Sequence, residues 1–105
     1  MITVMPQFKF PRPVPFERAR EAALVSAPRH RGVPGLIRKY IALSPDGMSG
    51  VGIYLWKSRD DADRMYNSEE WRAFVRERYG SEPTFSYLET LVVVDNVQSE
   101  IVSES

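Results

Sequence analysis

The sequence contains no cysteine. A chain without cysteine cannot form a disulfide, a thiolate metal site or a cysteine nucleophile, so these chemistries are excluded. An excess of charge is missing too, because 14 lysines and arginines balance 14 aspartates and glutamates. With no net positive field to attract DNA, RNA or an anionic membrane, we predict that nucleic acid is not a partner.

Long apolar runs are also missing. No stretch approaches the roughly 18 apolar residues that a membrane-spanning helix needs, and the segment Met1 to Phe10 lacks the basic start and apolar stretch of a secretion signal. We therefore expect a cytoplasmic protein with no membrane contact. Asp60, Asp61 and Asp63 lack the spacing and the glycine of a calcium loop, and no zinc-helix, phosphate-loop or serine-elbow motif occurs. We predict no metal site.

The length and composition predict a single domain over residues 1–105. A chain of this size can bury one modest hydrophobic core but not two. Hydrophobic residues make up 43% and charged residues 27% of the chain, values that are typical of a folded globular protein. Residues from about 97 to 105 are predicted to form a polar tail.

The predicted elements follow the order strand, helix, hairpin, broken helix, strand. The turn at residues 44–47, Ser-Pro-Asp-Gly, is the clearest local signal and predicts the hairpin. Strands are predicted with their cores at residues 7–10, 36–43, 49–56 and 84–95, and helices at residues 15–28, from 58 and at 68–80. This order predicts an α+β, ferredoxin-like βαββαβ fold, in which a four-stranded antiparallel sheet carries helices on one face only.

The other face of such a sheet is left open. In the hairpin we assign an aliphatic set to the helices: Ile37, Ile41, Leu43, Val51, Ile53 and Leu55. The aromatic residues Tyr40, Tyr54 and Trp56 then point to the open face, which is too apolar to remain in water. We therefore predict a homodimer in which a second copy covers this face, with Tyr40, Tyr54 and Trp56 at the dimer interface.

Parts of the hairpin and its flanks resemble a known family. The residues concerned are Pro34-Gly35-Leu36, Lys39, and Gly52-Ile53-Tyr54-Leu55-Trp56 leading to Ser58. Over residues 7–95 the chain resembles the YdhR-like monooxygenases of the dimeric α+β barrel superfamily, which also includes antibiotic biosynthesis monooxygenases. The resemblance implies a dimer whose sheets face each other as a barrel, with a ligand cavity between sheet and helices in each subunit.

The resemblance also bears on the reaction. Some relatives oxidise aromatic polyketides or quinols with molecular oxygen and no cofactor, whereas others cleave haem, isomerise lactones or have no assigned reaction. Haem-degrading relatives place a histidine ligand where Val75 falls in this chain, which counts against haem. The resemblance therefore implies that no cofactor is needed.

Lys39 is the most informative single residue. Alternation places it between Ile37 and Ile41 on the aliphatic face, where a charge is costly unless it is paired or used. Desolvation would lower its pKa and make it a catalytic base, or a donor to an anionic substrate such as an enolate or phenolate. The alternative is that Lys39 extends to the sheet edge or pairs with Glu89.

Other candidates are less specific. His30 is the only histidine and lies in an arginine-rich link, so it is a second catalytic candidate that could titrate near neutrality; the alternative is a simply exposed side chain. Four aromatic residues would meet over the sheet and either line a substrate-binding pocket or form core: Phe8, Tyr66, Trp71 and Phe74.

Three functions follow from these residues. The first is a cofactor-independent monooxygenase that acts on a small aromatic or quinol-like substrate, with Lys39 favouring the deprotonated form of that substrate. The second is a non-catalytic dimer that binds a small aromatic molecule in the same cavity. The third is a domain whose cavity is filled by side chains and which serves only in assembly. We take the first as the prediction.

Overall fold

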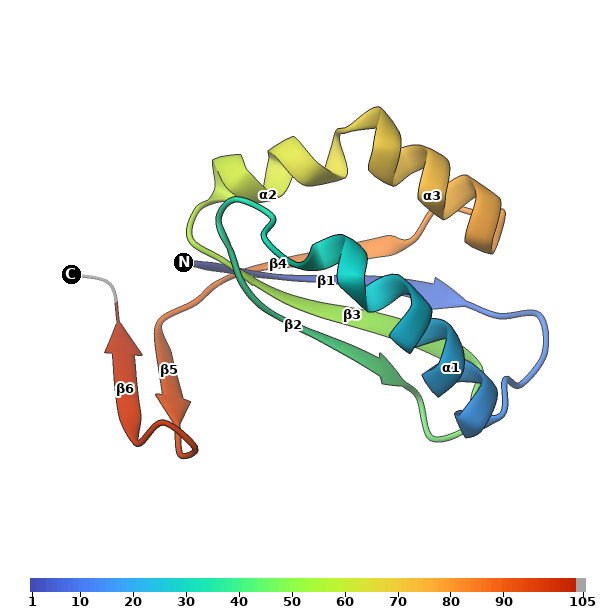
Figure 1. Ribbon diagram of the computed structural model, residues 1–105, viewed down its shortest axis with the longest axis horizontal. Coiled ribbons are helices and arrows are strands. Elements are labelled where there is room, and N and C mark those ends of the chain that lie inside the picture. The colour runs from blue at the N-terminus through green and yellow to red at the C-terminus, as the bar shows by residue number, and fades with distance from the viewer. Residues whose placement is uncertain (104–105) are drawn as a thin grey trace.

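The computed structural model describes residues 1–103 and confirms the predicted order of elements (Figure 1). The elements are β1 (Ile2–Lys9), α1 (Phe16–Ser26), the short 3-10 helix η1 (Ala27–His30), β2 (Leu36–Leu43), β3 (Ser49–Trp56), α2 (Arg59–Tyr66), α3 (Glu69–Tyr79), β4 (Thr84–Glu89), β5 (Val92–Asp95) and β6 (Glu100–Ser103). Strands β1 to β4 form an antiparallel sheet in the order β2-β3-β1-β4. The three α-helices lie on one face of this sheet. None of the helices within residues 1–103 is long and apolar enough to cross a membrane.

The broken helix begins and ends where its capping residues predict. The Ser58 hydroxyl accepts the Asp61 backbone N–H before α2, and the Ser68 hydroxyl accepts the Trp71 N–H before α3. Gly80 ends α3 with a φ of 70°, in the left-handed region that glycine adopts at low cost. These caps fix the two helices that lie over the sheet.

Strand β1 is longer than predicted. Its core was expected at residues 7–10 because Pro6 lacks an N–H for the sheet, yet the strand runs from Ile2 to Lys9. The β1–β3 pairing is interrupted between Val4 and Gln7, whereas Pro6 still lies opposite Phe85 of β4. The fully buried Pro6 ring packs in the core. The strand therefore tolerates the proline through its packing and its pairing with β4.

The predicted faces of the hairpin are correct for β2 from Lys39 to Leu43 and wrong for β3. Ser44 and Ser49 close a loop of four residues, and this even number sets odd residues of one strand opposite even residues of the other as far as Arg38; a register shift between Leu36 and Arg38 then places Leu36, rather than Ile37, opposite Trp56. Lys39 therefore lies opposite Tyr54 and shares the helix-covered face with it. The aliphatic side chains of β3, at positions 51, 53 and 55, point to the open face.

This register corrects two of the predicted dimer-interface residues. Tyr54 and Trp56 are only 3% and 0% exposed, and they pack beneath the helices. Neither can contact a second copy through the open face. Tyr40 does lie on the open face and is 57% exposed.

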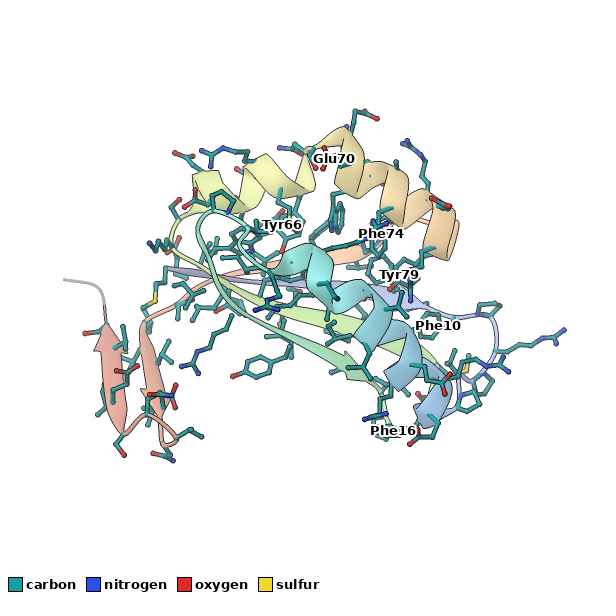
Figure 2. All side chains as sticks on the ribbon, in the orientation of Figure 1. Phe10, Phe16, Tyr66, Glu70, Phe74 and Tyr79 are labelled. Carbon is teal, nitrogen blue, oxygen red and sulfur yellow. The ribbon has the colours of Figure 1, made fainter. Side chains whose placement is uncertain are left out.

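The core between the sheet and the helices is aromatic. The Trp56 indole N–H donates to the Tyr66 hydroxyl over 3.1 Å, which satisfies two buried polar groups. Tyr66 points from α2 toward the sheet, and Phe10 and Tyr79 lie together near the end of α3 (Figure 2). The buried cluster consists of Ile2, Val4, Tyr54, Trp56, Ala62 and Tyr66.

The C-terminal region differs from the prediction. The strand expected over residues 84–95 is divided into β4 and β5, and β5 pairs with β6 instead of joining the main sheet. The predicted polar tail is thus partly a strand, Glu100–Ser103, while residues 104–105 lie outside the described part of the chain. Asp95 holds the hairpin, because its carboxylate accepts the N–H groups of Val97 and Gln98 and pairs with Arg38 of β2.

Candidate functional site

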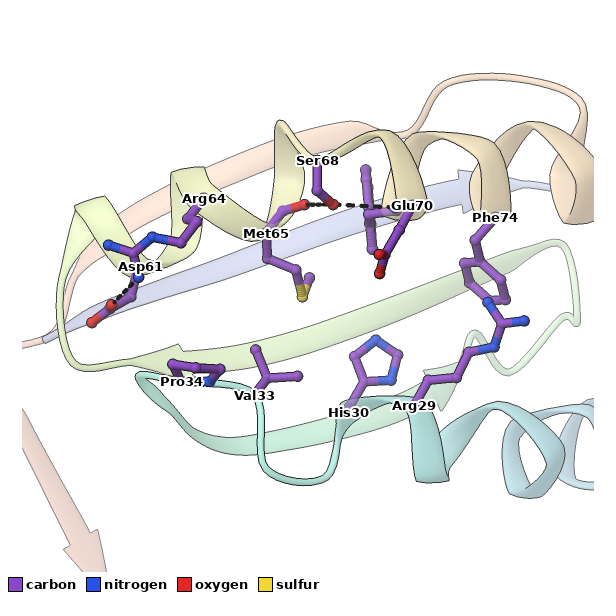
Figure 3. Close-up of a pocket in the computed structure, with 11 residues that line it drawn as sticks. Arg29, His30, Val33, Pro34, Asp61, Arg64, Met65, Ser68, Glu70 and Phe74 are labelled. Carbon is purple, nitrogen blue, oxygen red and sulfur yellow. Dashed lines mark hydrogen bonds and ion pairs between the residues drawn. The ribbon is translucent and has the colours of Figure 1, made fainter.

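A pocket of about 460 Å³ lies between η1 and the helices α2 and α3 (Figure 3). The link from η1 to β2 forms one wall, and the turn between α2 and α3 forms the other. Its lining residues are Arg29, His30, Val33, Pro34, Asp61, Arg64, Met65, Ser68, Glu70, Trp71 and Phe74. No strand residue is in this lining, so the pocket lies between the η1–β2 link and the helices rather than between the helices and the sheet, where the cavity was predicted.

Glycine allows the two walls to approach. Gly35 has a φ of 83°, and a Cβ atom at this position would lie 2.5 Å from the Asp61 Cβ. The Gly35 carbonyl accepts the Lys57 N–H over 2.8 Å, which ties the link to the start of α2. Only a residue without a side chain permits this close approach.

Two of the four predicted substrate-binding aromatics line the pocket. Trp71 and Phe74 project into it from α3. Tyr66 instead lies in the core, 5% exposed, with its ring centroid 5.1 Å from that of Trp71. Phe8 is stacked on Tyr79 at a centroid distance of 3.9 Å and does not line the pocket. Tyr66 and Phe8 thus support the fold behind the pocket wall.

Lys39 and His30, the two predicted catalytic residues, are in contact. The Lys39 Nζ lies 3.1 Å from Nε2 and 3.3 Å from Nδ1 of His30, and 4.5 Å from the centroid of the Tyr54 ring. The Tyr54 hydroxyl lies 3.4 Å from the same Nε2 atom. Of the three residues, only His30 lines the pocket; Lys39 and Tyr54 lie behind it, on the helix-covered face of the sheet.

The Lys39 ammonium has no carboxylate partner among residues 1–103. The suggested pair with Glu89 does not form, because β2 and β4 are the two opposite edge strands of the sheet. Lys39 is half-buried, and burial lowers its pKa to about 8. The side chain is therefore mostly protonated at neutral pH, with a small neutral fraction that can accept a proton.

His30 behaves differently from the prediction. Burial lowers its pKa most, the positive charge of Lys39 lowers it further, and a hydrogen bond with the Ser26 backbone only partly offsets these effects. The resulting pKa is about 4, so the imidazole of His30 is uncharged at pH 7. The prediction that His30 titrates near pH 7 is therefore wrong. A neutral imidazole has one acceptor nitrogen, which suits a contact with an ammonium group. Burial also raises the pKa of the Tyr54 hydroxyl, which stays protonated.

Sequence patterns did not identify Arg29 and Glu70 as pocket residues. Arg29 precedes His30 in η1, and its guanidinium lies 4.6 Å from the centroid of the Phe74 ring. Glu70 lies in the first turn of α3, at the opposite wall. Arg29 could have been found from its position beside His30, whereas nothing in the sequence separates Glu70 from its neighbour Glu69.

The arrangement suits a flat, acidic organic molecule. Apolar walls from Val33, Met65, Trp71 and Phe74 can hold an aromatic ring. Behind the lining residue His30, Lys39 offers a cation that is partly shielded from water, which strengthens its attraction for an anionic oxygen. Within residues 1–103, no group of three or more histidine, aspartate or glutamate side chains is placed to hold a metal ion.

Comparison with known proteins gives matches in structure only. No family model matches the sequence, and a search of curated proteins finds no match either. A monooxygenase from the gene ActVA-Orf6 of Streptomyces coelicolor, solved with the ligand Nanaomycin D, has a TM-score of 0.66 at 19% identity, over 85% of this chain and 86% of that chain. Rv0793 from Mycobacterium tuberculosis has a TM-score of 0.62 at 23% identity, over 86% and 94% of the two chains.

A third structure, of an antibiotic biosynthesis monooxygenase, has a TM-score of 0.60 at 17% identity, over 87% of this chain and 99% of that chain. Likeness at these identities establishes the fold, and it confirms the predicted α+β, ferredoxin-like class. An antibiotic biosynthesis monooxygenase is thus among the structures that share this fold.

Proposed function

We propose that this protein is a monooxygenase that oxidises a small hydroxylated aromatic substrate, such as a quinol, with molecular oxygen and without a bound cofactor. The observation that carries the proposal is the Lys39 ammonium, half-buried in contact with the pocket-lining His30 and without a counter-ion in the described chain. An anionic substrate oxygen would supply the missing negative charge. The shared fold with a monooxygenase solved with Nanaomycin D supports this choice of reaction.

The chemistry starts with a proton transfer. The neutral fraction of the Lys39 amine accepts the proton of the substrate hydroxyl, and the ammonium that results pairs with the substrate anion. This electron-rich anion then transfers one electron to oxygen, giving a substrate radical and superoxide. The two combine through a new C–O bond to a peroxide at a ring carbon that carries hydrogen.

The peroxide then breaks its O–O bond. The ring carbon loses its hydrogen and becomes a carbonyl, and the distal oxygen leaves as water. The Lys39 ammonium returns its proton to the peroxide, and the hydrogen of the ring carbon leaves as a proton, so the departing oxygen forms water. In total, one substrate and one oxygen molecule give one water and one product, in which a carbonyl oxygen has replaced two hydrogen atoms of the substrate. The protein supplies binding, orientation and a site with little water, which are the contributions that such chemistry requires.

Oxygen uptake tests the proposal. A panel of quinols, anthrones and small phenols is incubated with the protein in an oxygen electrode, alongside Lys39→Met and Lys57→Met. Lys57 is an exposed lysine and controls for the loss of one positive charge. We expect uptake with at least one compound, at least about tenfold slower in Lys39→Met and unchanged in Lys57→Met. Binding of these compounds without uptake by the wild-type protein would favour the non-catalytic binding function.

We also propose that two copies pair through their open sheet faces. Tyr40 and Leu88 on this face are 57% and 49% exposed. On the adjoining β5–β6 hairpin, Val94 and Ile101 lie opposite each other and are 63% and 73% exposed. A two-stranded hairpin is marginally stable alone, and a twofold pair would let each copy cover the apolar face of the other.

A further inference from the structure

Arg29 lines the pocket, and its guanidinium N–H groups make no hydrogen bond within residues 1–103. Its guanidinium lies over the Phe74 ring, a contact that uses the flat face of the group and leaves its N–H donors in the plane. Arg78 lies near the same ring at 5.7 Å, but its Nη2 donates to the Ala22 carbonyl over 3.0 Å. Of these two cations, Arg29 is the one that has no hydrogen bond or ion pair within the described chain.

The other charges of the pocket do not neutralise Arg29. Arg64 and Asp61 pair with each other over 3.0 Å, so together they add no net charge. Glu70 lines the opposite wall but makes no ion pair within 4.0 Å to any residue of the described chain. Two separate cations therefore serve the pocket, Arg29 beside Phe74 in its lining and Lys39 behind His30, against one unpaired carboxylate.

A carboxylate is the anionic substrate group that best fits the free guanidinium edge of Arg29. The planar edge of a guanidinium matches the two oxygens of a carboxylate, with two parallel N–H···O bonds. A phosphate would carry a larger charge and would meet only one guanidinium, with Glu70 in the same pocket.

We infer that the pocket selects aromatic substrates that carry a carboxylate in addition to the reacting hydroxyl group, with the carboxylate bound by Arg29 and the hydroxyl directed to His30 and the Lys39 ammonium that contacts it. This inference rests on the proposed function for the assignment of the reacting end. The Phe74 ring holds the guanidinium in place, so that a ligand loses less freedom on binding than it would beside a mobile side chain.

Binding without oxygen tests the inference apart from the reaction. Anaerobic titration calorimetry compares 6-hydroxy-2-naphthoate with its methyl ester, which keeps the ring and the hydroxyl but removes the negative charge. We expect the acid to bind the wild-type protein about tenfold more tightly than the ester, as one well-oriented ionic contact allows. In Arg29→Gln this preference should fall to within about twofold, while the affinity for the ester stays the same.

Two further variants separate a local contact from the net charge. Arg31→Gln removes an exposed arginine two positions from Arg29 and should keep the preference for the acid. Glu70→Gln removes the carboxylate of the opposite wall and should increase that preference. Equal binding of acid and ester by the wild-type protein, or a preference that persists in Arg29→Gln, would overturn the inference.

The two proposals fail in different ways. Loss of the acid preference together with oxygen uptake that depends on Lys39 would leave the proposed reaction in place and reject the role of Arg29. A clear acid preference that depends on Arg29, without oxygen uptake by any substrate, would support the carboxylate site and reject the oxygenase.

Discussion

Lys39 and His30 form a contact in which one side chain is charged and the other is neutral. The Nζ of Lys39 lies 3.1 Å from Nε2 of His30, and the charge of Lys39 is one cause of the lowered pKa of the histidine. His30 in turn contributes to the burial of Lys39 without supplying a negative charge. The pair therefore keeps a cation next to the pocket-lining His30 at neutral pH.

His30 should make the protein sensitive to acid. Its pKa is about 4 in the folded chain and 6.5 in an unfolded one, so the unfolded state binds more protons between these values. The free energy of unfolding should therefore fall as pH decreases from 6.5 to 4. Urea denaturation at pH 6.8 and 4.5 measures this loss, which should be smaller in His30→Gln. An equal loss in both proteins would show that His30 does not titrate in this way.

Lys39→Met should stabilise the protein at neutral pH. The pKa of Lys39 is about 8 in the folded chain against 10.5 in an unfolded one, so burial of the charged form opposes folding. We expect a gain in the free energy of unfolding of roughly 1–2 kcal/mol at pH 7. The gain should shrink between pH 8 and 10.5, because the folded wild-type protein releases its proton first. Lys57→Met is the control in the same denaturation series.

Gly35 and Gly32 provide a matched pair in the pocket wall. Both have a positive φ, of 83° and 72°, so alanine is strained at either position. A methyl group at Gly35 would collide with Asp61, whereas at Gly32 nothing lies within 4 Å. Gly32→Ala should cost about 1 kcal/mol, and Gly35→Ala about 2–4 kcal/mol, measured by urea denaturation. Similar losses for both variants would mean that the link can move away from α2.

Tyr40→Asp tests the proposed pairing of open faces. A carboxylate at this position would be buried without a partner if a second copy covers the sheet, so the dimer should dissociate. Light scattering at low micromolar concentration should give twice the monomer mass for the wild-type protein and the monomer mass for Tyr40→Asp. Tyr87→Asp, on the helix side of the sheet, is the contrasting variant and should remain dimeric if it folds. A monomeric wild-type protein would reject the pairing.

Local patterns in the sequence predicted the elements and the unusual placement of Lys39. Caps and turns depend on residues that are close in the chain, which is why Ser58, Ser68 and Gly80 could be interpreted correctly. The alternation around Lys39 likewise identified the helix-covered face of β2, and the structure confirms it. These features need no knowledge of distant contacts.

The errors concern relationships between segments. Tyr54 and Trp56 were assigned to the open face because the register of the hairpin was assumed, whereas the four-residue loop sets it. Arg29 and Glu70 meet in one pocket although they lie 41 positions apart in the chain, from 29 to 70. A single sequence gives the character of each segment but not which distant segments enclose the same space.

The loop of four residues between β2 and β3 also limits how this chain can evolve. If β2 keeps its place and one residue is inserted or deleted in this loop, each residue of β3 moves by one position along β2. Every side chain of β3 would then point to the opposite face of the sheet. Trp56 and Tyr54 would then leave the core, and Lys39 would lose the Tyr54 ring that it contacts. Length changes in this turn should therefore survive selection in steps of two residues.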